Sequence, residues 1–191
     1  MFKKPAFVLP LLVFLLCSCN NTPIPRPRGF FRIELPPSEF IETDYEGPYS
    51  FKYPQYAVPE VLSQNSQNNG WINLTFPQFN GKLHLSYKTV DNNLATLIND
   101  AHDMAMKHIP KSTGIDEKKY IFPNSKVYGV GYVINGSEAA SSYQFFVTDS
   151  TTHFLRGALY FNVIPNNDSL APVIAFLTSD IEKIIESIRW K

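Results

Sequence analysis

Alternating hydrophobic and polar positions indicate that the first half of the chain is rich in strands. Residues 71–76 (W-I-N-L-T-F) alternate as a half-buried strand does, and residues 30–35 and 49–53 are short aromatic runs bounded by proline. The pair Asn80-Gly81 favours a type I′ turn, because both residue types adopt positive φ readily. These features predict several strands, with a hairpin that joins residues 71–79 to residues 82–90.

The hydrophobic period changes to that of a helix after Asp91, which suits an N-cap. Apolar residues then recur every three or four positions from Leu94 to Ile109, and Pro110 ends the pattern. A second stripe of this kind runs from residue 173 to residue 188, behind an N-cap signal at residues 166–169. Each stripe predicts an amphipathic helix with one buried face.

Three more strand patterns lie between the two helices, at residues 126–134, 140–149 and 153–164. Gly129 and Gly131 lie inside the first of them, where glycine indicates a closely packed neighbour or a bulge and not a phosphate-binding loop. The order of elements predicts an α+β domain with a single, mainly antiparallel sheet covered by helices. A meander followed by an isoleucine-rich helix resembles the architecture of Mog1/PsbP proteins, a likeness that concerns the fold alone.

The first 18 residues have the features of a lipoprotein signal peptide. Lys3 and Lys4 precede an apolar stretch at residues 6–16, which is shorter than the roughly 20 residues that cross a bilayer. The sequence Leu16-Cys17-Ser18-Cys19 matches a lipobox, in which a small residue precedes the acylated cysteine, so Cys19 is the expected lipidation site. We therefore predict a signal peptide over residues 1–18, the lipidated cysteine with a proline-rich tether over 19–29, and one α+β domain over 30–191. The alternative is an ordinary secretory signal with two incidental cysteines.

Charge and cysteine content exclude several classes of function. The 17 basic and 17 acidic residues cancel, so no single-signed field is available to hold nucleic acid. Both cysteines lie near the N-terminus, which leaves the domain without a cysteine nucleophile, a disulfide framework or a Cys-rich zinc site. The four histidines are scattered, and we expect His84 and His153 to be plain surface residues. We therefore expect no metal, no cofactor and no enzymatic activity.

Surface candidates are arginine and aromatic residues. The tether arginines suit a solvated linker, lipid head-group contacts or docking to an acidic partner. The aromatic residues of the first sixty positions either wrap the flank of the domain or bind a partner; they are Phe30, Phe31, Tyr45, Tyr49, Phe51, Tyr53 and Tyr56. The first hypothesis is a non-enzymatic partner-binding protein that uses Arg26, Arg28, Phe30, Phe31, Arg32 and Arg156. The alternative is a small-ligand or lipid-binding module, or a cryptic hydrolase, with a pocket between sheet and helix lined by Tyr128, Tyr132 and Tyr143.

Several segments together carry a family resemblance. They are residues 27–36 (P-R-G-F-F-R-I-E-L-P), 47–54 (G-P-Y-S-F-K-Y-P), 81–88 (G-K-L-H-L-S-Y-K), 144–150 (Q-F-F-V-T-D-S), 153–162 (H-F-L-R-G-A-L-Y-F-N) and 169–174 (S-L-A-P-V-I). With these segments the chain resembles the gliding-motility lipoprotein family GldD of the Bacteroidetes over nearly its whole mature length. The resemblance implies an envelope lipoprotein required for gliding, held in the bilayer through acylated Cys19 and tied to proteins of the type IX secretion and gliding machinery, with no assigned catalytic activity.

The residues after the lipidated cysteine bear on its location. Surface-exported lipoproteins of that phylum carry acidic residues there, whereas this chain has Asn20-Asn21-Thr22. The expected location is therefore the outer membrane, on its periplasmic face.

Overall fold

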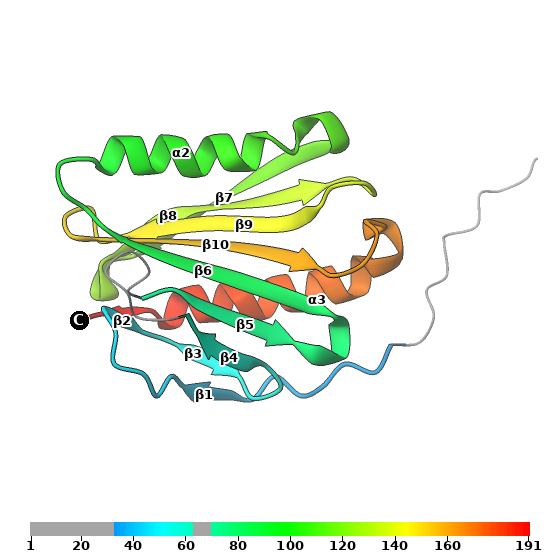
Figure 1. Ribbon diagram of the computed structural model, residues 1–191, viewed down its shortest axis with the longest axis horizontal. Coiled ribbons are helices and arrows are strands. Elements are labelled where there is room, and N and C mark those ends of the chain that lie inside the picture. Colours follow the sequence, from blue (N-terminus) through cyan, green and yellow to red (C-terminus); the bar gives the residue numbers. More distant parts are fainter. Residues whose placement is uncertain (1–32, 63–69) are drawn as a thin grey trace, which may run out of the picture. The chain divides into compact units, whose positions relative to one another are not determined.

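The structure, a computed structural model, describes residues 33–62 and 70–191. Its centre is an antiparallel sheet of seven strands in the order β4-β5-β6-β10-β9-β8-β7 (Figure 1). The strands are β4 (Val58–Val61), β5 (Ile72–Phe76), β6 (Gly81–Thr89), β7 (Gly114–Phe122), β8 (Val127–Asn135), β9 (Ser141–Thr148) and β10 (His153–Phe161). The predicted signal peptide, the tether and the candidates Cys19, Arg26, Arg28, Phe30, Phe31 and Arg32 lie outside the described residues.

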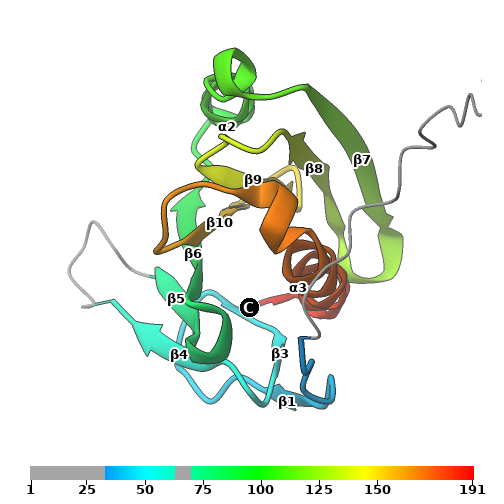
Figure 2. The same cartoon turned by 90° about the vertical axis from the view of Figure 1, so that its right-hand side faces the viewer.

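Two helices cover opposite faces of this sheet. Helix α2 (Leu94–Met106) packs on β9 and β10, and helix α3 (Asn167–Ser187) packs on the other face of β9. Seen along the sheet, the strands curve around α3 while α2 lies outside the curve (Figure 2). The predicted α+β class, with one antiparallel sheet covered by helices, is confirmed.

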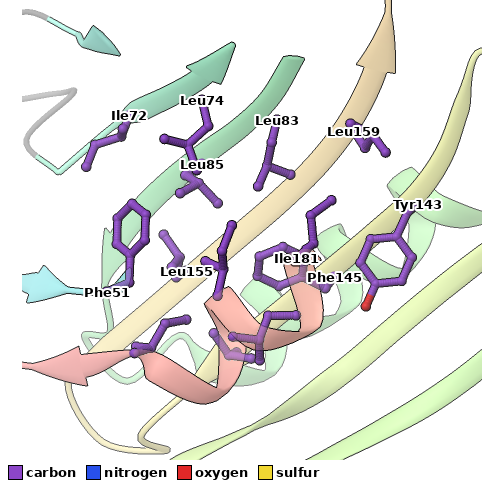
Figure 3. Packing of buried hydrophobic residues seen from close by; sticks show 14 of the residues in the cluster. Phe51, Ile72, Leu74, Leu83, Leu85, Tyr143, Phe145, Leu155, Leu159 and Ile181 are labelled. Atoms are coloured by element: carbon purple, nitrogen blue, oxygen red, sulfur yellow. The ribbon is translucent and has the colours of Figure 1, made fainter. Parts of the chain in front are cut away.

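The larger hydrophobic core fills the space between the sheet and α3. Odd-numbered residues of β6 and β10, such as Leu83, Leu85 and Leu155, are buried there against Ile181 of α3 (Figure 3). Because side chains alternate along a strand, the even-numbered residues of the same strands face α2. A smaller core on that side joins α2 to β8, β9 and β10; it contains Leu97, Ala101, Ala105, Tyr132, Phe146 and Phe154.

The first described segment, residues 33–57, wraps the flank of the domain as a strap. It contains β1 (Phe40–Glu42), which pairs with β3 (Lys52–Pro54), and β2 (Tyr49–Ser50), which pairs with the C-terminal strand β11 (Arg189–Trp190). Tyr49 is fully buried, and its ring lies 5.8 to 6.3 Å from those of Tyr45, Phe51, Tyr87 and Trp190. Of the two readings of the aromatic segment, wrapping is therefore correct for its described part.

A buried carboxylate fastens the strap to α3. Asp180 is 1% exposed, and its Oδ2 accepts hydrogen bonds from Ser38 Oγ at 2.9 Å and from Tyr56 OH at 2.7 Å. Its Oδ1 accepts from Lys183 Nζ at 2.9 Å. Burial, followed by the bond to Asp180, raises the pKa of Tyr56, so this tyrosine remains a neutral donor.

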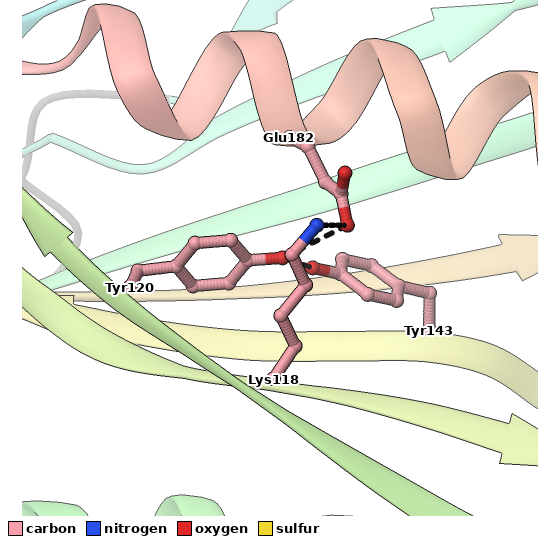
Figure 4. A network of polar contacts seen from close by, with 4 residues as sticks. All are labelled: Lys118, Tyr120, Tyr143 and Glu182. Atoms are coloured by element: carbon pink, nitrogen blue, oxygen red, sulfur yellow. Dashed lines mark hydrogen bonds and ion pairs between the residues drawn. The ribbon is translucent and has the colours of Figure 1, made fainter.

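A second polar network fastens the edge strand β7 to α3. Glu182 Oε1 accepts from Lys118 Nζ at 2.7 Å and from Tyr120 OH at 3.3 Å, and the hydroxyl of Tyr120 also meets that of Tyr143 at 2.5 Å (Figure 4). Since the proton of Tyr120 goes to Glu182, Tyr143 is the donor between the two tyrosines. Burial raises the pKa of Tyr120 to about 12, in keeping with that role. Each polar group of the network therefore has a partner, and the network joins β7 and β9 to α3.

The structure corrects several sequence predictions about elements. The N-cap residue of α2 is Asn93 and not Asp91. Asn80-Gly81 does not form a type I′ turn, because Pro77 ends β5 and starts the 3-10 helix Pro77–Phe79, after which only Asn80 has positive φ. Residues 33–35 are not in a strand. Strand β7 was not predicted, because most of its residues are exposed at the sheet edge and show no alternation.

The glycines of β8 fit the predicted close approach of neighbours. A Cβ at Gly129 would clash with the carbonyl oxygen of Phe146 in the adjacent strand. One at Gly131 would lie 2.5 Å from the hydroxyl of Tyr143, which occupies that space in the polar network.

Candidate functional site

A cleft of about 420 Å³ lies beside α2, on the α2 face of β5, β6 and β10. It arises because α2 packs over β9 and β10 and does not extend over β5. One wall is α2, and the floor is made by the even-numbered residues of β6 and β10 with Asn73 of β5. The lining residues are Leu62, Trp71, Asn73, His84, Leu85, Ser86, Lys88, Leu97, Asp100, Ala101, Met104, Phe154, Arg156, Ala158 and Tyr160.

Strand register brings the polar groups of the floor together. Asn73 is opposite His84 across β5 and β6, and His84 is opposite Ala158 across β6 and β10. Arg156 is opposite Ser86, two residues along the strands from the pair of His84 and Ala158, and it therefore lies on the same face as His84. The floor thus gathers polar side chains from three strands that are separate in sequence.

Arg156 is held by a buried amide. Its Nη2 donates to Oε1 of Gln144 at 2.6 Å, and Gln144, which is 1% exposed, reaches His108 Nε2 at 2.9 Å with its own Nε2. A guanidinium cannot accept a hydrogen bond, so the amide must direct its oxygen to Arg156 and its NH₂ to His108. His108 therefore accepts through Nε2 and is neutral. Burial and the charge of Arg156 both lower the pKa of His108, which agrees with that state.

His84 is held in a similar way. Its Nδ1 lies 2.7 Å from Oδ1 of Asn73, which is 7% exposed, and the imidazole ring contacts Tyr160 edge-on at 5.8 Å. Because the amide oxygen accepts, Nδ1 carries the proton and Nε2 is left as an acceptor. Burial, then the charges of Lys82 and Arg156, lower the pKa of His84, so this ring is neutral as well.

The charge of Arg156 is not compensated by a carboxylate. No Asp or Glu of the described residues forms an ion pair with it, and its Nε is buried without an acceptor there. Burial lowers the pKa of Arg156, although a guanidinium stays charged. Lys88 and Asp100 are the other charged lining residues, so with neutral histidines the cleft carries a formal charge of +1.

The structure brings only one of the predicted site residues into this cleft. Arg156, expected as a surface docking residue, is half-buried in its floor. The alternative prediction placed a pocket between sheet and helix, where this cleft lies, but the tyrosines predicted to line it do not do so. Tyr143 is buried on the α3 face, whereas Tyr132 is buried under α2, because the register places them on opposite faces of the sheet.

The two histidines predicted at the surface have different outcomes. His84 is exposed as predicted, and it also lines the cleft. His153 is half-buried; it stacks on Trp190 with ring centroids 5.2 Å apart, and its Nδ1 lies 2.8 Å from the hydroxyl of Tyr87. A signal for the cleft was present in residues 153–161 (H-F-L-R-G-A-L-Y-F), where an arginine occupies an inward-facing position between Phe154 and Ala158.

Within residues 33–62 and 70–191, no group of three His, Cys, Asp or Glu side chains is placed to hold a metal ion. Neither α2 nor α3 is long and apolar enough to cross a membrane.

Comparisons with known proteins identify a family for this chain. No curated protein matches the chain significantly. Among solved structures, it is similar to the PsbP protein (CyanoP) of Synechocystis sp. PCC 6803, with 7% identity and a TM-score of 0.46, over 84% of this chain and 98% of that one. At this level the likeness carries no information about function. The profile of the gliding motility lipoprotein GldD family matches residues 20–190. The chain therefore belongs to the GldD family of gliding motility lipoproteins, membrane-anchored proteins of the cell envelope with a role in gliding.

Proposed function

We propose that this protein is a non-enzymatic binding component of the gliding apparatus and that the cleft beside α2 holds a partner protein of the envelope. The observation that carries the proposal is the state of Arg156, a half-buried cation in the floor of an open cleft with no carboxylate paired to it among the described residues. Holding a guanidinium partly out of water without a counter-ion costs stability. A binding site is the usual reason for retaining such a group.

The surroundings of Arg156 support binding more than catalysis. Gln144 and Asn73 each engage a neutral histidine, and Gln144 also orients the guanidinium. In these contacts neither histidine accepts a hydrogen bond from a serine or threonine hydroxyl, as a base that activates a nucleophile would. The arrangement fixes one cation in place and leaves its charge for a ligand.

The rest of the proposal concerns anchoring and location. Acylation of Cys19 would hold the protein in the outer membrane, with the domain on the periplasmic side, where proteins of the type IX secretion and gliding machinery would be its partners. The lipobox, the family description and the uncharged Asn20-Asn21-Thr22 support this placement. The tether arginines Arg26 and Arg28, with Phe30, Phe31 and Arg32 just after the tether, would add contacts near the bilayer.

The test is a gliding assay on Arg156→Glu, with Arg189→Glu as the matched control. Arg189 is an exposed arginine of β11 outside the cleft. We expect Arg156→Glu to abolish spreading at normal protein abundance and Arg189→Glu to leave it unchanged. Normal gliding by Arg156→Glu cells would remove the cleft from the proposal.

Crosslinking from native membranes tests the partner and the anchor together. We expect the wild-type protein to recover gliding or type IX secretion proteins, and we expect Cys19→Ala, which cannot be acylated, to recover none. Charge reversal at Arg26, Arg28 and Arg32 tests the tether and the segment just after it in the same way. Recovery of an uncomplexed monomer in every case would contradict the partner-binding proposal.

A second candidate function rests on the size of the cleft. Its volume of about 420 Å³ lies within the roughly 300–1,000 Å³ range of small-molecule sites. A small-ligand or lipid-binding module, or a cryptic hydrolase, would place its ligand there. Native mass spectrometry that finds a bound small molecule, while crosslinking finds no envelope protein, would favour this candidate.

A further inference from the structure

We propose that the cleft recognises the C-terminal end of a partner chain, with the terminal carboxylate on Arg156 and an apolar last side chain against α2. This inference rests on the proposed function and names what the cleft binds. It follows from three features of the cleft, which are its charge, its apolar wall and its hydrogen-bond acceptors.

The charge of the cleft fits a monoanion. Arg156 and Lys88 against Asp100 leave a formal charge of +1, and both neighbouring histidines are neutral. A guanidinium presents a planar fork of donors that matches the two oxygens of a carboxylate. Because no carboxylate of the described residues pairs with Arg156, an incoming carboxylate would supply the counter-ion that the fold does not provide.

The apolar wall begins next to this cation. Phe154 and Ala158 flank Arg156 on the same face of β10, and Ala101 and Met104 of α2 lie across from them. Residues two apart in a strand are separated by about 7 Å, so the cation and its apolar neighbours lie within reach of a single ligand residue. The last residue of a chain provides both groups from one Cα, whereas an internal Asp or Glu has no second, apolar side chain.

The acceptors of the cleft favour a peptide over a fatty acid. Asp100 and the free Nε2 of His84 can offer a ligand only hydrogen-bond acceptors. Backbone N–H groups of a peptide would satisfy them. An alkyl chain would cover them without giving a donor, which carries a desolvation penalty.

The experiment measures peptide binding by the fluorescence of Trp71, which lines the cleft and is fixed by a bond from Nε1 to the carbonyl of Tyr87 at 2.9 Å. The protein is the full mature chain in lipid nanodiscs. The probe is a pool of pentapeptides with apolar residues at the last two positions, prepared as free acids and as C-terminal amides. Decanoate and an amidated pool with an internal Glu are added as separate arms.

We expect the free acids to bind at least about tenfold more tightly than the amides. Arg156→Gln should abolish this difference, and Arg189→Gln, which removes the same charge at a distance, should retain it. Circular dichroism of both variants shows that the fold is intact.

Three results would overturn the inference. They are equal binding or no binding of acid and amide pools, a preference that survives in Arg156→Gln, and tighter binding of decanoate or of the internal-Glu pool than of the free acids. The proposed function can fail separately, because it depends on gliding by Arg156→Glu cells. If gliding requires Arg156 but acids and amides bind equally, the cleft is a partner site and only the chain-end assignment is wrong.

Discussion

Replacing Asp180 by alanine tests how the strap is held to α3. The change removes the acceptor of two hydroxyl groups, Ser38 Oγ and Tyr56 OH, both bonded to the same carboxylate oxygen at 2.9 and 2.7 Å. Hydrogen bonds to a charged group contribute about 1.5–3 kcal/mol each, and two that share one oxygen do not add fully. We therefore expect a loss of about 3 kcal/mol in the free energy of unfolding.

Lys183→Met is the matched variant on the other side of the same carboxylate. The side chain of Lys183 is 49% exposed, so its ion pair with Asp180 is screened by solvent. The same ammonium lies 5.3 Å from the ring centroid of Phe40, and we expect the two contacts together to contribute about 1 kcal/mol.

Urea unfolding separates the two variants. With a dependence of about 2 kcal/mol per molar urea, the midpoint should fall by about 1.5 M for Asp180→Ala and by about 0.5 M for Lys183→Met. Hydrogen exchange should show faster opening of residues 38–56 in Asp180→Ala. Equal losses in the two variants would refute the reasoning, because they would mean that Lys183, through Asp180 and Phe40, contributes as much as the two hydroxyl groups of the strap.

Three further predictions concern packing, acid stability and the cleft. Gly129→Ala should lower the free energy of unfolding by about 3 kcal/mol, since its Cβ meets the backbone of the adjacent strand. Gly114→Ala, with no atom within 4 Å of its Cβ, should leave it unchanged, and thermal unfolding of both variants measures the difference. Burial opposes ionisation of Asp149, but backbone hydrogen bonds from residues 151–153 outweigh it and lower its pKa to about 2. Since the pKa of Asp149 is lower in the folded state, this stabilisation is complete above about pH 4 and is lost as the pH falls towards 2. Asp149→Asn should therefore reduce the loss in the free energy of unfolding between pH 4 and pH 2 by about 1 kcal/mol after solvent screening. Arg156→Gln should raise the pKa of His108 in an NMR titration, because part of its lowering comes from the Arg156 charge, and an unchanged value would contradict the assigned contact.

The hydrophobic pattern predicted the elements whose buried faces are continuous. Helix α3 and strands β8, β9 and β10 were predicted because their apolar residues follow a single period. Strand β7 was missed because most of its residues, including Lys119, are exposed at the sheet edge, and because a polar network contributes to its contacts with α3. Turn geometry at Asn80 was mispredicted because Pro77, three residues earlier, had already fixed the local backbone.

The cleft could not be predicted from the sequence, because it forms where α2 leaves part of one sheet face uncovered. The pattern of β6 shows that His84 and Lys88 lie on the face opposite the main core. It does not show that α2 stops short of them, which is set by how α2 packs on β9 and β10. For the same reason Arg156 was identified as a charged candidate, while its partner Gln144 was not, since the two meet only through strand pairing.

The pairing of β2 with β11 has a consequence for the order in which parts of the chain fold. Arg189 and Trp190 pair with Ser50 and Tyr49, and the backbone N–H of Lys191 donates to the carbonyl of Pro48 at 3.0 Å. Tyr49 and Ser50 are synthesised long before β11, so this part of the strap stays unpaired until β11 has been made. A nascent chain that stops before β11 leaves β2 without its partner strand, so closing this part of the strap is a late, long-range step of folding.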